Sequence, residues 1–341
     1  PVIGITGSNG KTTTKELISL VLEKKFNVWH TQGNLNNHIG VPLTLLSVKP
    51  DTQVAIVQMG ANHIGEIGAL CEIARPDHGL ITNVGSAHLE GFGSFDGVRQ
   101  GKGELYNFLK RVGGEIFVNV DNHWLMEMVE DYPWIGYGTR DSAVVKASDV
   151  SAEPFLSFYL TTTQVKDMPV NTNLTGLYNL ENVLAAASVG HYFGVEESLV
   201  RDAVEQYLPE NNRSQVLNTE NNRILLDAYN ANPSSMKAAL EHFRSIDHPQ
   251  KVLVLGGMKE MGHQSKAEHE KLIEEIIKTD FVSCYLTGPE FKGLVPQDSS
   301  CHWYASTAEL KEALKYDAIK DALILIKGSR ANQLEEVVDV L

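Results

Sequence analysis

The sequence predicts an α/β protein with two domains. The chain has 341 residues, which is room for two domains of roughly 100–200 residues each. Short apolar runs rich in β-branched residues alternate with amphipathic stretches, as in parallel sheets flanked by helices. One stretch, residues 144–174, alternates in strand fashion with no helical period, which predicts a small antiparallel sheet.

The first domain is predicted to span residues 1–214. Alternating strands and helices are expected at residues 2–6, 11–25, 54–59, 64–74, 79–84 and 115–120. The antiparallel stretch follows, and helical periodicity returns at residues 180–192 and 196–207. The polar residues 209–214 then have the composition of a domain boundary.

The second domain is predicted to span residues 215–341. The alternation restarts at residues 223–228, 234–244, 251–256, 266–278, 281–287, 307–315, 322–327 and 334–340. This is the size of a small doubly wound sheet. Ligands in such folds bind at the carboxyl ends of strands, so motifs at those ends are the candidates for a site.

Composition excludes several classes of protein. The 43 acidic and 29 basic residues give a net charge of −14, which disfavours broad binding to nucleic acid. No apolar run approaches the ~20 residues of a membrane-spanning helix, so we expect no stable membrane insertion. The three cysteines are scattered, and we expect buried free thiols.

The chain opens on a strand without a secretory leader, and we expect a cytoplasmic location. The sequence does not decide the oligomeric state, and a monomer is the working expectation.

A phosphate-binding loop follows the first predicted strand. Glycines let backbone N–H groups converge on phosphate oxygens, a lysine adds charge, and a hydroxyl in the first helical turn can bind magnesium. The residues are Gly7, Ser8, Asn9, Gly10, Lys11, Thr12 and Thr13. Because strand, Gly-Lys-Thr and helix occur in the required order, a nucleoside triphosphate is implied. The alternative is a glycine-rich turn with a surface lysine.

The variant G-x-x-G-x-x-G-K-T-T-T resembles the ATP loop of the Mur ligases, which add amino acids to the peptidoglycan precursor. Further matching segments are G-N-L-N-N-H-I-G-V-P from Gly33, M-G-A-N-H from Met59, T-N-V-G-S-A-H-L-E-G-F-G from Thr82, R-S-Q from Arg213, D-A-Y-N-A-N-P from Asp227 and K-G-S-R from Lys327. Two of them, A-H-L-E-G-F-G and D-A-Y-N-A-N-P, are most similar to the branch that adds D-alanyl-D-alanine to a UDP-N-acetylmuramoyl tripeptide.

The resemblance implies a central P-loop ATPase domain, a Rossmann-like acceptor-binding domain, and a reaction in two steps. ATP phosphorylates the terminal carboxylate of the tripeptide, and the amine of D-alanyl-D-alanine then attacks the acyl phosphate. Lys11 would supply positive charge to the transferred phosphoryl group, and Arg213 would reach the ATP phosphates. The family also carries an N-terminal domain that binds the uridine nucleotide, which we expect to be absent from this chain.

Magnesium ligation is also implied by the resemblance. The matching ligands are Thr12, His88 and Lys102, the last as a carbamate formed with carbon dioxide. A carbamate forms only from a neutral amine, so Lys102 must have a lowered pKa. A structural histidine and a solvated lysine are the alternatives. At Gln58 the family usually has a glutamate, and an uncharged amide is the weaker magnesium ligand.

The remaining candidate residues bind substrates in the resemblance. Asn179 and Asn182 match asparagines near the nucleotide base, with helix capping as the alternative, and Asp227 matches a residue that contacts the ribose or orders the hinge. The candidates for the precursor and the acceptor are Asn36, Asn37, Asn230, Asn232, Ser329 and Arg330. Turn chemistry would also explain Asn36 and Asn37, and an ordinary polar loop would also explain Ser329 and Arg330.

Other functions stay open at this point. Another ligase of the superfamily, of the folylpolyglutamate or cyanophycin type, is the nearest alternative, although the segment from Asp227 argues against it. An inert nucleotide-binding regulator is the alternative from a different class, and Gln58 motivates it. The sequence leaves open whether the tripeptide ends in diaminopimelate or lysine.

Overall fold

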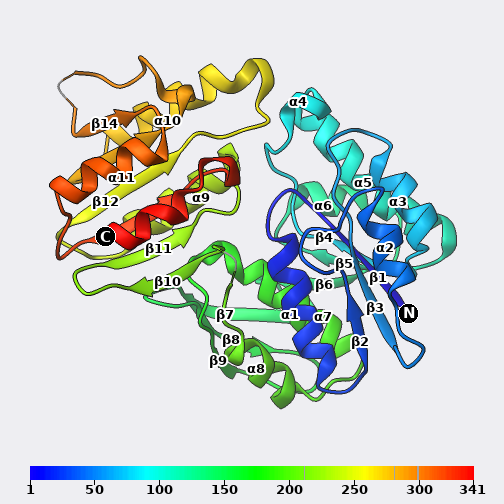
Figure 1. Ribbon diagram of the computed structural model, residues 1–341. Coiled ribbons are helices and arrows are strands. Elements are labelled where there is room, and N and C mark those ends of the chain that lie inside the picture. Colours follow the sequence, from blue (N-terminus) through cyan, green and yellow to red (C-terminus); the bar gives the residue numbers. More distant parts are fainter. Residues whose placement is uncertain (211, 280, 298) are drawn as a thin grey trace. The chain divides into compact units, whose positions relative to one another are not determined.

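The computed structural model describes residues 1–210, 212–279, 281–297 and 299–341, which divide into two compact units (Figure 1). The first unit comprises Pro1–Ser86 and Gly91–Tyr207, and the second comprises Ala87–Glu90 and Leu208–Leu341. Asn211, inside the predicted boundary stretch, lies outside the described residues. The boundary at residue 214 stays a prediction.

The first unit is built on one mixed sheet, which has nine strands in the described part of the chain, in the order β2-β3-β1-β4-β5-β6-β7-β8-β9. The strands are β1 (Val2–Thr6), β2 (Val28–His30), β3 (Val54–Gln58), β4 (His78–Ile81), β5 (Glu115–Asn119), β6 (Ile135–Gly138), β7 (Val145–Ser151), β8 (Ser157–Thr161) and β9 (Met168–Asn171). The strands from β2 to β7 pair in parallel, and β7, β8 and β9 pair antiparallel. The predicted antiparallel strands therefore exist, but they extend the parallel sheet instead of forming a separate one.

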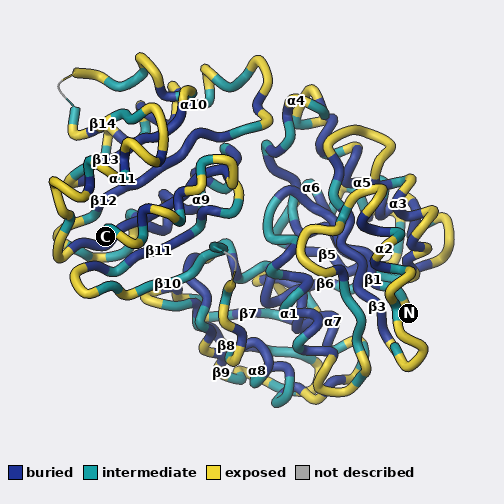
Figure 2. Tube along the Cα trace, viewed as in Figure 1, coloured by how far each residue is buried: buried dark blue, intermediate teal, exposed yellow. Residues whose placement is uncertain are grey.

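Helices cover both faces of this sheet. They are α1 (Lys11–Glu23), α2 (Gly40–Leu46), α3 (Glu66–Ala74), α4 (Leu89–Phe92), α5 (Phe95–Val112), α6 (His123–Met128), the 3₁₀ turn η1 (Leu177–Asn179), α7 (Leu180–Tyr192) and α8 (Glu197–Gln206). Buried residues of α1, α7 and α8 form one core cluster with the strands (Figures 1 and 2). The main effect of this core is to fix α1 and α7 side by side, so that the starts of both helices border the phosphate loop.

Helix α5 packs on the opposite face at two glycines. A Cβ added at Gly4 would lie 3.1 Å from a methyl carbon of Leu105, and one at Gly79 would lie 2.9 Å from a methyl carbon of Leu109. The Cβ added at Gly79 would also lie 2.9 Å from the main-chain oxygen of Gly4, so only glycine fits there. This contact fixes the height of α5, and with it the position of Lys102, above the sheet.

The second unit contains a sheet with the strand order β10-β11-β15-β12-β13-β14. Its strands are β10 (Gln215–Asn218), β11 (Arg223–Asp227), β12 (Lys251–Gly256), β13 (Ser283–Thr287), β14 (Cys301–Tyr304) and β15 (Leu323–Lys327), and only the β10–β11 pair is antiparallel. The helices are α9 (Pro233–Ser245), α10 (Ser265–Ile277) and α11 (Thr307–Tyr316), with 3₁₀ turns η2 (Gly262–Gln264), η3 (Pro289–Phe291), η4 (Arg330–Asn332) and η5 (Leu334–Val340).

Consecutive residues of β11, β12 and β15 are buried, so both faces of this sheet are covered, as in a doubly wound sheet. The predicted final helix is present as the 3₁₀ helix η5. The three cysteines are free and buried, as predicted. No helix among the described residues combines the length and apolar character needed to span a membrane.

Candidate active site

The phosphate loop closes around its own lysine. Gly10 has a φ of 80° and precedes the first residue of α1, so the loop turns directly into the amino end of the helix. The ammonium group of Lys11 donates to the carbonyl oxygens of Gly7 at 2.7 Å and Ser8 at 3.1 Å. Thr12 is buried and Thr13 half-buried in the first turn. The positive charge of Lys11, which would balance a bound phosphate, therefore already lies beside the loop.

Hydrogen bonds from the turn after β4 hold the phosphate loop in place. The Ser8 hydroxyl donates to the carbonyl oxygen of Gly85 and accepts from its N–H, at 3.1 and 2.9 Å. The Asn9 carbonyl accepts from the Thr82 hydroxyl at 2.6 Å, and the Asn9 N–H donates to the Asn83 side-chain oxygen at 3.0 Å. The loop backbone is thus held in place by neighbouring side chains as well as by its own turn.

Thr12 meets Gln58 at the end of β3. The Thr12 hydroxyl donates to the Gln58 side-chain oxygen at 3.2 Å, and the Gln58 N–H donates to the hydroxyl of Thr31 at 3.0 Å. The buried Lys15 donates to the carbonyl oxygen of Thr31 at 2.9 Å. Two of the predicted magnesium ligands are therefore brought together as oxygen donors, the type of ligand that Mg²⁺ prefers.

Lys102 is buried on α5 and lies against the loop that follows β3. Its ammonium group donates to the carbonyl oxygen of Ala61 at 3.1 Å and lies 5.0 Å from the ring centre of Phe92. Burial lowers the pKa of Lys102 to about 8, against the opposing influence of Glu66 and Glu104. A solvated lysine is therefore excluded, and a neutral amine, which carbamate formation requires, is accessible near neutral pH.

His88 belongs to the second unit. Its Nδ1 lies 2.5 Å from a carboxylate oxygen of Glu260, and both residues have positive φ, 55° for His88 and 62° for Glu260. Non-glycine residues in this region are strained, which is frequent at functional sites. The position of His88 relative to Thr12 and Gln58 remains a prediction, and the described residues contain no cluster of three or more His, Cys, Asp or Glu side chains suited to a metal.

Asn179 and Asn182 lie at the start of α7, beside the phosphate loop. Asn182 accepts from the hydroxyl of Thr14 at 2.9 Å and donates to Asn179 at 2.9 Å. Asn179 donates to the carbonyl oxygen of Thr175 at 2.8 Å. Neither side chain caps the helix, so the capping alternative is wrong, and both amides instead fix the start of α7 against α1.

An aromatic ring brings two predicted arginines together within the second unit. The guanidinium carbon of Arg213 lies 3.5 Å from the ring centre of Tyr229, and that of Arg330 lies 5.2 Å from the same centre. Arg330 is exposed. Stacking of this kind orients guanidinium groups while leaving their edges available to anions.

The ends of β11 and β15 carry an ion pair. Lys327 is buried and its ammonium group lies 2.5 Å from the carboxylate of Asp227, and it also donates to the carbonyl oxygen of Asn230 at 3.4 Å. Ser329 is buried, and its hydroxyl oxygen accepts from the Lys259 N–H at 3.0 Å. Asp227, Asn230 and Ser329 therefore share one edge of the sheet, as the strand-end rule predicts.

Three further predicted substrate residues also have structural partners. Asn232 caps α9 in a capping box with Ser235, and Asn37 accepts from the N–H groups of Ile39 and Gly40 at the start of α2. The carbonyl oxygen of Asn36 accepts from Gly60 at 2.7 Å. The contacts of Asn36 and Asn37 correspond to the turn-chemistry alternative, and all three substrate roles stay predictions.

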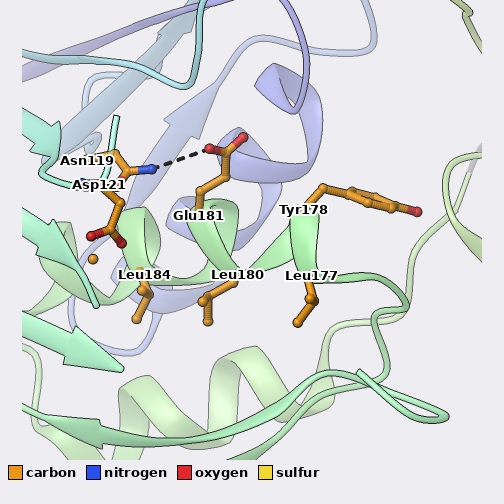
Figure 3. Close-up of a pocket in the computed structure, with 8 residues that line it drawn as sticks. Asn119, Asp121, Leu177, Tyr178, Leu180, Glu181 and Leu184 are labelled. Atoms are coloured by element: carbon orange, nitrogen blue, oxygen red, sulfur yellow. Dashed lines mark hydrogen bonds between the residues drawn. The ribbon is translucent and has the colours of Figure 1, made fainter. Parts of the chain in front are cut away.

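Sequence reasoning missed Glu181, which follows Leu180 in the first turn of α7. Its carboxylate accepts from the amides of Asn83 at 2.5 Å and Asn119 at 3.4 Å. Burial raises the pKa of Glu181 to about 7, although both amides lower it. It borders a pocket of about 180 Å³ beside the ends of β5 and β6 (Figure 3), lined by Asn119, Asp121, Gly138, Leu177, Tyr178, Leu180, Glu181 and Leu184. The helix dipole alone explains an acidic residue at the second position of a helix, so nothing in the sequence singled out Glu181.

Two families of domains match this chain. Residues 5–190 match the Mur ligase middle domain, and residues 212–330 match the Mur ligase, glutamate ligase domain. The chain belongs to the Mur ligase family.

Two named relatives match the sequence of this Mur ligase along nearly its whole length. It is 33% identical to the UDP-N-acetylmuramoyl-tripeptide–D-alanyl-D-alanine ligase of Bacillus subtilis, over 99% of this chain and 75% of that protein. It is 32% identical to the Escherichia coli protein of the same name, over 100% of this chain and 76% of that protein.

Solved structures support the same relationship. MurF from Acinetobacter baumannii superposes with a TM-score of 0.89 at 29% identity, over 99% of this chain and 75% of that chain. MurF from Thermotoga maritima, solved in complex with ADP, superposes with a TM-score of 0.85 at 27% identity, over 99% of this chain and 78% of that chain. The mixed α/β fold of this Mur ligase is therefore that of MurF.

Proposed function

We propose that this chain is an ATP-dependent ligase of peptidoglycan precursor synthesis, which joins D-alanyl-D-alanine to a UDP-N-acetylmuramoyl tripeptide through an amide bond. The observation that carries the proposal is the identity of about one third, over nearly the whole chain, to ligases of that name. Because such precursors are water-soluble nucleotides, we place the reaction in the cytoplasm, and we propose a monomer.

The reaction we propose has two balanced steps. A carboxylate oxygen of the tripeptide attacks the γ-phosphorus of ATP, and ADP leaves with the electrons of the broken P–O bond. The amine of the dipeptide then attacks the carbonyl carbon of the acyl phosphate, loses a proton, and expels inorganic phosphate. Activation is needed because a carboxylate repels nucleophiles, and it depends on positive charge and in-line positioning.

The phosphate loop supplies the groups for the first step. Backbone N–H groups of residues 10–13 would hold the phosphates, and Lys11 would exchange its bonds to the carbonyl oxygens of Gly7 and Ser8 for phosphate oxygens. Arg213, held on Tyr229, would add a second positive charge to the γ-phosphate. These groups position the phosphoryl group and stabilise its charge.

The residues present fit a magnesium ion. Thr12 and Gln58 offer two oxygen donors already in contact, and buried Lys102 has the lowered pKa that carbamate formation requires. Bound Mg²⁺ would neutralise charge on the β- and γ-phosphates. We propose Thr12, Gln58, His88 and carbamylated Lys102 as its protein ligands.

Acceptor binding is proposed for the second unit. Arg330 presents an exposed guanidinium beside Tyr229, and Ser329 follows Lys327, whose buried ammonium group pairs with Asp227. A guanidinium suits the terminal carboxylate of a dipeptide because it can bind both oxygens. Asn230 and Asn232 are proposed to border the same site, and Asn36 and Asn37 the precursor side.

Acceptor-dependent phosphate release tests the proposal. The chain is incubated with ATP, Mg²⁺ and saturating muramoyl tripeptide, together with D-alanyl-D-alanine, L-alanine, D-glutamate or L-lysine. We expect only D-alanyl-D-alanine to stimulate release and to give a product of the summed mass less water. Stimulation by another acceptor would indicate a different ligase of the superfamily. ATP binding without release from any acceptor would favour the inert regulator that Gln58 suggests.

A further inference from the structure

Glu181 connects the start of α7 with the ends of two strands. Its two carboxylate oxygens accept separate hydrogen bonds, one from the Asn83 amide at 2.5 Å and one from the Asn119 amide at 3.4 Å. Asn83 follows β4 and Asn119 ends β5, so one side chain holds together both strand ends beside the phosphate loop. Figure 3 shows the bond from Asn119 to Glu181.

Asn83 makes its remaining contacts with the phosphate loop itself. Its side-chain oxygen accepts from the Asn9 N–H at 3.0 Å, and its amide also lies 3.3 Å from the Asn9 carbonyl. Its main-chain carbonyl accepts from the Ser8 N–H at 3.0 Å. Glu181 is therefore separated from the loop backbone by a single side chain.

The chemistry of a carboxylate decides which way the Asn83 amide faces. An ionised carboxylate accepts hydrogen bonds but cannot donate them, whereas an amide has one accepting end and one donating end. With Glu181 ionised, the NH₂ group of Asn83 must face it, so the oxygen of Asn83 must face the Asn9 N–H. A flipped amide would place two oxygens together and leave the Asn9 N–H opposite a donor.

We propose that Glu181 is a positioning residue, which fixes the amide orientation of Asn83 and thereby holds the loop backbone at Asn9 in its phosphate-binding conformation. The inference rests on the proposed function only in taking ATP as the ligand of the loop. It assigns Glu181 no contact with the nucleotide.

The pocket gives solvent access to this arrangement. Leu177, Leu180 and Leu184 line it together with Asp121, which accepts from the N–H of Thr139 at 2.7 Å. Tyr178 also lines the pocket, and Tyr137 on β6 is a further ionisable neighbour. The pKa of Tyr137 is raised by burial and by Tyr106 and Glu181. Since the pKa of Glu181 is about 7, lowering the pH below neutrality protonates it. A protonated carboxyl can donate as well as accept, so it no longer fixes the amide.

Nucleotide binding measures the effect without requiring turnover. A fluorescent ATP analogue is titrated with Mg²⁺ into the wild type, Glu181→Gln and the matched control Asp121→Asn, which makes the same acid-to-amide change on the same pocket. We expect Glu181→Gln to weaken binding about tenfold, the equivalent of ~1.4 kcal/mol, and Asp121→Asn to change it less than twofold. Equal affinity of wild type and Glu181→Gln, or equal weakening in both variants, would overturn the proposal.

A double-mutant cycle and a pH series separate positioning from general stability. If Glu181 acts through Asn83, the Asn83→Ala and Asn83→Ala/Glu181→Gln proteins bind alike, whereas additive losses contradict the proposal. Wild-type affinity should fall more steeply from pH 8 to pH 6 than that of Glu181→Gln, and superimposable profiles would contradict it. If the wild type binds no nucleotide, the proposed function fails as well; if it binds and the variants match it, only this inference fails.

Discussion

Thr12 and Gln58 are in direct contact, because the Thr12 hydroxyl donates a hydrogen bond of 3.2 Å to the side-chain oxygen of Gln58. This bond joins the first turn of α1 to the end of β3. Both side chains are buried, and Gln58 is only 1% exposed. A magnesium ion at this point would meet two neutral oxygens, which bind it more weakly than a carboxylate.

Replacing Gln58 with glutamate is expected to strengthen magnesium binding, because the new ligand carries a negative charge. We expect the Mg²⁺ concentration for half-maximal nucleotide binding to fall about tenfold. A magnesium titration monitored with the fluorescent nucleotide measures this, with Gln164→Glu as an exposed control. An unchanged magnesium requirement in Gln58→Glu would argue against a metal role for this position.

Gly10→Ala should weaken nucleotide binding at least tenfold while leaving the fold intact. A Cβ at Gly10 would lie 2.3 Å from the side-chain oxygen of Asn182, and φ is 80°. Gly65→Ala is the matched control, since Gly65 also precedes a helix with positive φ, 92°, but nothing lies within 4 Å of its added Cβ. We expect at least a tenfold loss of affinity for Gly10→Ala alone. Comparable binding by both variants would show that the close approach to Asn182 has no bearing on the loop.

Lys102→Met should stabilise the first unit and inactivate the enzyme. In carbon-dioxide-free buffer, where no carbamate forms, the lysine is charged below pH 8 in both the folded and unfolded chain, and the folded state bears the cost of burying the charge. Methionine removes that cost, so we expect the free energy of unfolding at pH 7 to rise by on the order of 2 kcal/mol.

The pH dependence of that gain has a defined sign. The pKa of Lys102 is about 8 in the folded chain and 10.5 for the ordinary lysine, so between these values the unfolded chain binds more protons. Wild-type stability then rises with pH, and the advantage of Lys102→Met shrinks from pH 8 to pH 10.5. Urea unfolding at pH 7 and pH 10 measures the difference, and Lys110→Met on the same helix is the control. A gain that is independent of pH would contradict this account.

Asn232→Ala and Asn232→Asp distinguish capping from substrate binding. The side chain of Asn232 accepts from the Ser235 N–H at 2.9 Å at the start of α9. Loss of such a cap costs about 1 kcal/mol, and aspartate retains it. We expect Asn232→Ala to lower the midpoint of thermal unfolding and Asn232→Asp to restore it. If Asn232 also binds substrate, the KM for the dipeptide rises in both variants; a normal KM in the stable aspartate variant would limit Asn232 to capping.

Features encoded locally were predictable from the sequence. The strand β1, the phosphate loop and α1 are contiguous, so composition and order suffice to identify them. Helix α7 was predicted with its observed bounds because its apolar residues are nearly continuous. The resemblance to a family added Lys102, whose burial then depends on α5 packing against Gly4 and Gly79.

Features that depend on distant residues were not predictable. Glu181 lies 98 positions from Asn83 and 62 from Asn119, so their convergence follows from strand order alone. The strand β2 has three residues, too few for a periodic signal. The continuity of the antiparallel strands with the parallel sheet depends on the pairing of Tyr137 with Val145 between β6 and β7, which neither segment encodes by itself.

Transfer of oxygen-18 from substrate to phosphate tests the central claim most directly. Muramoyl tripeptide labelled in its terminal carboxylate is incubated with the chain, ATP, Mg²⁺ and D-alanyl-D-alanine, and the phosphate released is analysed by mass spectrometry. An acyl phosphate intermediate requires one labelled oxygen in each phosphate released, together with amide product in equal amount. Unlabelled phosphate, or phosphate released without amide product, would contradict the account.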